Sequence, residues 1–104
     1  MTEIMQGATQ TLEWPLPTSI DLSAANIYFS AFQFGHLVLK KSNASVHYEG
    51  NTVYVDLSQM DTLQFKEGEA KVQLNITSDG GATRIPTYEA DIYVLANELT
   101  EVLP

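Results

Sequence analysis

Hydrophobic and polar residues alternate with a period of two along several short segments of the chain. A two-residue repeat places one set of side chains on one face of a β-strand, whereas a helix repeats every 3.6 residues. We therefore predict strands at residues 11–16, 45–49, 52–57, 71–77 and 88–94. Their apolar, inward-facing members are Leu12, Trp14, Leu16, Val46, Tyr48, Val53, Val55, Leu57, Val72, Leu74, Ile76, Tyr88, Ala90, Ile92 and Val94.

Two further strands are predicted at residues 27–34 and 37–40. Residues 27–34 are apolar on both faces, which is typical of a central strand or of one whose outer side another chain covers. Pro15 and Pro17 lack the backbone N–H that a ladder requires, so they stop further ladder pairing at the end of the 11–16 segment.

Glycine and asparagine mark the reversals between these segments. Gly35-His36 has glycine first, as a type II′ turn requires, and predicts a hairpin between residues 27–34 and 37–40. Gly50-Asn51 and Asp79-Gly80-Gly81 predict two more, because these residues reach positive φ at low cost. About seven short strands with regular turns favour a sandwich or a barrel.

Residues 58–64 interrupt the alternation. Ser58 stands three residues before Asp61, which is close to a capping box, and Met60, Leu63 and Gln64 follow at helical spacing. We predict one helical turn that carries the chain between two sheets, with Leu57, Leu63 and Phe65 closing the end of the core.

The two chain ends are predicted to depend on a partner for their order. Residues 95–103 fit either a short helix or an extended arm, and Leu99, Val102 and Leu103 would share one helical face. We expect a single β-sandwich domain over residues 1–104 with an N-terminal arm and this C-terminal tail.

The net charge of −8 comes from 13 acidic and five basic residues that are spread along the chain. Such a chain repels phosphate backbones and anionic lipid, so we expect neither a nucleic acid nor a membrane as its partner. Cysteine is absent, which excludes disulfides and thiolate chemistry. No apolar run is long enough to span a bilayer, and the acidic N-terminus is unlike a secretion signal, so we expect a protein that is made and kept in a cytoplasm or released from a cell by lysis.

Candidate catalytic and metal-binding residues are few. His36 and His47 have no ligand spacing around them, and the pairs Glu67/Glu69 and Glu89/Asp91 fit a solvated strand face better than acid–base chemistry. The serines lack a nucleophile elbow and no phosphate loop is present. We predict a protein that is not an enzyme and has no cofactor or metal. Aromatic Tyr54 and Tyr93 point outward and are candidates for a sugar- or protein-binding surface.

Residues 57–65, Leu-Ser-Gln-Met-Asp-Thr-Leu-Gln-Phe, resemble a Leu-Thr-Gln-x-x-Thr-x-x-Phe signature of small proteins from phages and prophages of Gram-positive gut bacteria. The resemblance extends over nearly the whole chain, from Gln6-Gly7-Ala8-Thr9 through the Gly68–Gln73 strand to the Leu99–Leu103 ending. It implies a virion component: an accessory of the capsid, neck, tail or baseplate.

The same nine residues are similar to the Leu-x-x-x-Asp-Thr-x-x-Tyr loop of immunoglobulin domains. This chain has Phe65 in place of the tyrosine and lacks the two cysteines. The resemblance implies an all-β, immunoglobulin-like antiparallel sandwich, an architecture frequent in phage particles.

From these observations we expect a phage virion structural protein that forms a homo-oligomer or symmetric assembly with other virion proteins, located in the virion and, during assembly, in the host cytoplasm. A glycan-binding module and an acidic inhibitor protein are the alternatives. The residues expected to anchor an interface are Trp14, Phe32, Phe34, Tyr54, Tyr93, Leu99, Val102 and Leu103.

Overall fold

The computed structural model describes residues 2–16, 22, 23, 25–42, 45–78 and 83–104. In this part of the chain it has eight strands and one short helix, α1, at Gln59–Leu63. The strands are β1 (Thr2–Met5), β2 (Gln10–Pro15), β3 (Asn26–Gln33), β4 (His36–Ser42), β5 (Val46–Glu49), β6 (Thr52–Leu57), β7 (Gly68–Ser78) and β8 (Thr83–Leu95).

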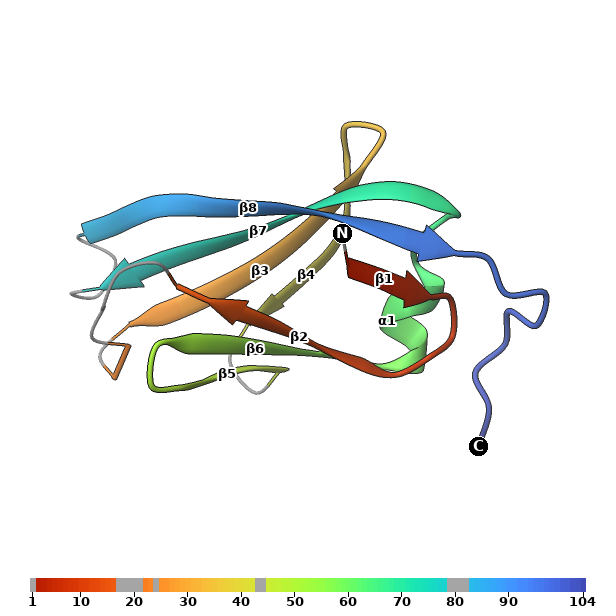
Figure 1. Ribbon diagram of the computed structural model, residues 1–104, viewed down its shortest axis with the longest axis horizontal. Coiled ribbons are helices and arrows are strands. Elements are labelled where there is room, and N and C mark those ends of the chain that lie inside the picture. Colours follow the sequence, from red (N-terminus) through yellow and green to blue (C-terminus); the bar gives the residue numbers. More distant parts are fainter. Residues whose placement is uncertain (1, 17–21, 24, 43–44, 79–82) are drawn as a thin grey trace.

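The strands form two sheets that face each other (Figure 1). One has the order β1-β8-β7-β3-β4 and the other β2-β6-β5. The predicted all-β sandwich is confirmed. The described residues hold one strand more than the approximate number expected, and one pair, β1 with β8, is parallel. The order is consistent with an immunoglobulin-like sandwich, in which four strands stand opposite a three-stranded sheet.

The core is made by the predicted alternation of side chains. The inward residues of β3, β6 and β7 are almost completely buried, whereas the residues between them are partly or fully exposed. The apolar side chains of lowest exposure are Phe29, Ala31, Val53, Val55, Leu74, Ile76 and Val94, each at 0%. Strand β3 lies between β7 and β4, which agrees with the central position predicted for residues 27–34.

Helix α1 confirms the predicted turn and its cap. The Ser58 hydroxyl accepts a hydrogen bond from the Asp61 backbone N–H, and the Asp61 carboxylate accepts one from the Ser58 N–H, so a complete capping box is present. Leu57 and Phe65 on either side of the helix are buried, as expected for residues that close the end of the core, whereas Leu63 is only partly buried.

Two glutamine side chains connect the start of β7 to distant parts of the chain. Gln33, buried at the end of β3, donates to the Lys66 carbonyl at 2.8 Å and accepts from the Lys66 N–H at 2.8 Å. Gln6 donates to the Phe65 carbonyl at 2.7 Å and accepts from the Asn97 N–H at 3.1 Å. The segment before β7 is therefore held between the two chain ends and the tip of β3.

The β3–β4 turn differs from the prediction by one residue. Gln33 pairs with His36, so Phe34-Gly35 forms the two-residue loop instead of Gly35-His36. Both loop residues have positive φ, +53° at Phe34 and +77° at Gly35, which is the pattern of a type I′ turn.

At the predicted Gly50-Asn51 turn, Glu49 pairs with Thr52 and Gly50 has φ +59°. Ser78 likewise pairs with Thr83, although Asp79-Gly80-Gly81, like Pro17, lies outside the described residues.

The C-terminal tail is irregular, with bends at Glu98 and Glu101 and no helix in the described residues. It passes beside α1, where the Gln59 side chain donates to the Leu103 carbonyl at 2.9 Å and accepts from the Leu103 N–H at 2.8 Å (Figure 1). Leu99, Val102 and Leu103 remain about half exposed.

Phe34→Asn is expected to raise the free energy of unfolding by about 1 kcal/mol, because a bulky residue in the left-handed region is strained and asparagine is favoured at that turn position. Urea denaturation followed by Trp14 fluorescence measures the change. Gly35→Ala, which introduces strain at the next position, should shift the midpoint the other way. A Phe34→Asn protein less stable than the parent would contradict the strain argument.

Candidate functional site

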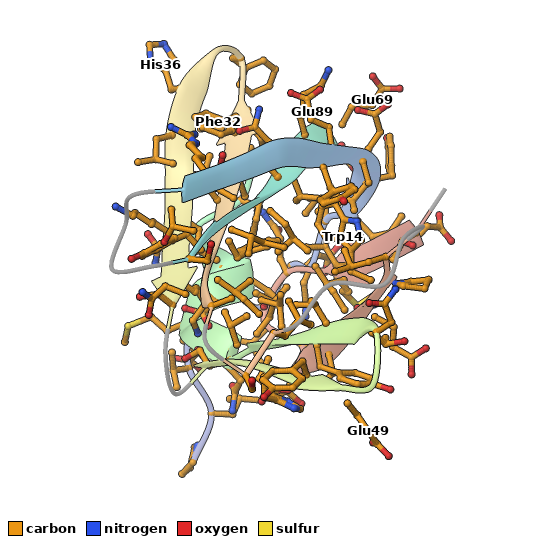
Figure 2. The ribbon with its side chains drawn as sticks, turned by 90° about the vertical axis from the view of Figure 1, so that its left-hand side faces the viewer. Trp14, Phe32, His36, Glu49, Glu69 and Glu89 are labelled. Atoms are coloured by element: carbon orange, nitrogen blue, oxygen red, sulfur yellow. The ribbon has the colours of Figure 1, made fainter. Side chains whose placement is uncertain are left out.

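The predicted interface residues lie in separate regions of the surface. Trp14 on β2 lies between the two sheets and is partly buried, while Phe32 on β3 lies near His36 at the β3–β4 hairpin (Figure 2). Phe34, at the tip of that hairpin, is 73% exposed, and Leu37 on β4 is 56% exposed. Trp14 therefore does not join Phe32 and Phe34 in one anchor cluster.

The β3–β4 hairpin carries Phe34, the most exposed of the large apolar side chains in the described part of the chain, and Leu37, which is more than half exposed. Phe32 stands opposite Leu37 in the ladder, so both side chains lie on the outer face of the five-stranded sheet. Phe32, Phe34 and Glu69 line a hollow of about 350 Å³ beside this ladder. The hairpin thus combines a projecting aromatic residue with a shallow recess at its base.

Tyr54 lies on the outer face of the three-stranded sheet. Its ring stacks on that of His47 from β5, with centroids 5.4 Å apart and planes inclined by 16°. The Asp56 carboxylate contacts His47 Nε2 at 3.1 Å and accepts a hydrogen bond from the Thr11 hydroxyl at 2.8 Å. The Thr11 hydrogen bond, together with His47, outweighs the effect of desolvation and lowers the pKa of Asp56.

Tyr93 does not share this surface. It pairs with Glu69 on the outer side of β8, in the other sheet, so Tyr54 and Tyr93 face away from each other. Figure 2 shows the same opposition through labelled acids, with Glu69 and Glu89 on one side of the sandwich and Glu49 on the other.

The histidines and acid pairs do not converge. His36 begins β4 and His47 lies on β5, in different sheets. Within the described ranges, no group of three or more histidine or acidic side chains could hold a metal ion. Glu89 accepts a hydrogen bond from Gln73 at 2.8 Å and lies 3.8 Å from Lys71, which places it in a cross-strand polar network. The described helix is too short and polar to cross a membrane.

Sequence analysis missed the ion pair between Lys41 and Asp61. Lys41 points inward from edge strand β4, because it pairs with buried Phe29, and its ammonium group contacts the Asp61 carboxylate on α1. The two side chains are only 16% and 14% exposed. Lys41 also donates to the Asp56 carbonyl at 3.2 Å. The partners are 20 positions apart in the sequence, so no local pattern indicates the pair.

Asp61 therefore has two roles, helix cap and ion-pair partner. Partial burial by itself raises the pKa of its carboxyl, but the hydrogen bonds from Lys41 and Ser58 outweigh that effect and the net pKa is lowered. The charged form is thus the one that the fold stabilises.

Lys41→Met should lower the free energy of unfolding by about 2 kcal/mol, since it removes hydrogen bonds to a largely buried carboxylate while keeping the aliphatic stem. Lys40→Met, the matched change at an exposed neighbour, should stay within about 0.5 kcal/mol of the parent. Chemical denaturation of both variants tests this. Equal effects would show that the Lys41–Asp61 pair contributes little.

Charged Asp61 should stabilise the fold fully at pH values above the ordinary aspartate pKa of about 4, neutral pH included. This stabilisation should be lost as the pH falls through the lowered pKa that Asp61 has in the folded state. The difference in unfolding free energy between the parent and Asp61→Asn is therefore expected to shrink between about pH 5 and pH 2. Urea titrations at each pH measure it. A difference that is constant with pH would contradict the assignment.

No protein-family model matches the chain, and no curated protein matches it.

Proposed function

We propose that the protein is a structural component of a phage particle that acts through contacts with other virion proteins and with copies of itself. The observation that carries the proposal is the exposure of large apolar side chains on the β3–β4 hairpin and on the C-terminal tail of a small acidic sandwich. Phe34 and Leu37 project from the β3–β4 hairpin, and Leu99, Val102 and Leu103 line the C-terminal tail. Exposed apolar residues that gather at one place are typical of protein-binding surfaces.

The rest of the molecule supports this interpretation, because the core is packed without the exposed residues of the hairpin and the tail. Among the described residues, every buried side-chain polar atom has a hydrogen-bond partner, and the apolar core is continuous across both sheets. The hairpin and the tail therefore add surface to a sandwich that is already packed. In this role the protein is made in the host cytoplasm and is incorporated into the virion.

The test is whether the protein is a stoichiometric part of purified particles. Particles from a phage that encodes the chain are banded on a density gradient and analysed by quantitative mass spectrometry. We expect a constant ratio of this chain to the major capsid protein across the band. Loss of the chain during banding would overturn the proposal.

A pair of matched variants connects this test to the hairpin. Phe34→Asn with Leu37→Thr removes the apolar tip, and we expect incorporation to fall at least about tenfold, the equivalent of 1.4 kcal/mol in contact energy. Tyr48→Thr, which changes an exposed aromatic residue on the other sheet, is the control and should be incorporated normally. Thermal melts confirm that both variants fold.

Glycan binding remains the second candidate because of one observation, the Tyr54–His47 stack beside Asp56 and Thr11. Aromatic rings with neighbouring carboxylate and hydroxyl groups form the usual platform for a sugar ring. Titration calorimetry with fragments of host wall polysaccharide tests it. If this surface binds, Tyr54→Ala should abolish the heat of binding, whereas Tyr93→Ala, on the opposite face, should leave it unchanged.

A further inference from the structure

One side of the sandwich is open. Strand β1 pairs with β8 only along Ile92–Leu95, so within the described strands residues 83–91 of β8 have no neighbour on that side. Figure 1 shows β1 beside the C-terminal part of β8 alone. Strand β2 is an edge of the other sheet and, among the described strands, pairs with β6 alone. Two unpaired backbone edges therefore border the same side of the molecule.

Burial along β8 changes at the point where β1 begins. Ile92 and Val94 face inward and are 2% and 0% exposed. Ala90 faces inward too, because it pairs with buried Val72, yet it is exposed to solvent. An inward-facing residue of a sandwich is normally covered by the opposite sheet or by an additional strand. Ala90 therefore marks a position where the inner face of the sheet lacks a cover.

The uncovered position is part of a groove of about 630 Å³ between β2 and β8. Leu12, Trp14, Pro15 and Ile92 supply its apolar lining. Glu13 from β2 and Asp91 from β8 add negative charge, and the described residues that line the groove include no lysine or arginine. Asp91 has no ion-pair partner among the residues that the structure describes.

We propose that this groove binds an extended segment of another polypeptide, which adds to β8 along Tyr88–Asp91 in line with β1. A free strand edge supplies backbone hydrogen bonds to such a segment, and a groove beside the edge accepts alternate side chains. The segment would place apolar side chains over Ala90 and Trp14 and lysine or arginine side chains beside Glu13 and Asp91. The charge of the groove selects a basic segment over an acidic one.

This inference deepens the proposed virion role by naming one kind of contact, and it can be tested without a particle. Trp14 is the chain's single tryptophan and lines the groove, so its fluorescence reports on occupancy. The ligand used is a capped synthetic peptide, Lys-Val-Thr-Val-Lys-Val-Thr, and the control peptide has glutamate in place of each lysine. We expect a blue shift of Trp14 emission that saturates with the basic peptide and an affinity at least about tenfold weaker for the acidic one.

Three variants locate the site. Ala90→Arg fills the groove from an exposed position and should abolish the blue shift, and Asp91→Lys should reduce or reverse the preference for the basic peptide. Glu49→Lys, which makes the same charge change on the far side of the other sheet (Figure 2), should bind like the parent. Circular dichroism and thermal melts show whether each variant is folded, and amide exchange should show new protection at Tyr88–Asp91 in the parent.

Several results would overturn the inference. These are equal binding of the two peptides, binding that Ala90→Arg does not affect, or new amide protection on β4 instead of β8. Self-association of the free protein that Ala90→Arg abolishes would identify a second copy, not a basic partner segment, as the occupant. If the peptide binds but the chain is absent from particles, the groove keeps its assignment and the virion role is overturned. If the chain is a stoichiometric part of particles but the peptide does not bind, the virion role stands and the groove assignment is overturned.

Discussion

The fold depends on the burial of one face of each sheet against the other. Phe29 and Leu74 from the five-stranded sheet and Val53 and Val55 from the three-stranded sheet are completely buried. Each such side chain contributes about 1.5–3 kcal/mol when it is removed from water. The chain has no cysteine, so no disulfide helps to hold the two sheets together. Strand register, turn positions and the closing helix are all constrained by the need to keep these side chains in contact.

Polar interactions close the end of the sandwich that contains α1. Ser58 and Asp61 cap the helix, Lys41 binds the same carboxylate from edge strand β4, and the Thr62 hydroxyl donates to the Ala8 carbonyl at 2.9 Å. Gln33 connects β3 to Lys66 close by. These contacts join segments that are distant in the sequence. They therefore hold in place the segments that close this end of the core, without adding to the apolar surface that the core buries. They also make this end sensitive to pH through Asp61.

The surfaces proposed for function lie at places where the packing of the two sheets ends. The β3–β4 hairpin projects from the five-stranded sheet and exposes Phe34, the tail leaves β8 and exposes Leu99, and the groove opens where β1 begins beside Ile92. Strand edges and loops at such positions can bind a partner without disturbing the core. A small sandwich can therefore offer several contacts at once, as a component of an assembly needs to do.

The sequence by itself determined the features that depend on neighbouring residues. The two-residue repeat identified which side chains of β6 and β7 are buried, the Ser58–Asp61 spacing predicted α1, and Gly50-Asn51 predicted the β5–β6 turn. Only the tertiary structure decided the rest. The four residues of β1 are too few to show a repeat, and the β3–β4 turn shifted to Phe34-Gly35 because cross-strand register outweighed the cost of positive φ at a phenylalanine. The Lys41–Asp61 pair, the separation of Tyr54 from Tyr93 and the exposure of Ala90 all follow from which strands are adjacent. Adjacency is set by packing across the whole chain, whereas a local pattern reports only which face of a strand is apolar.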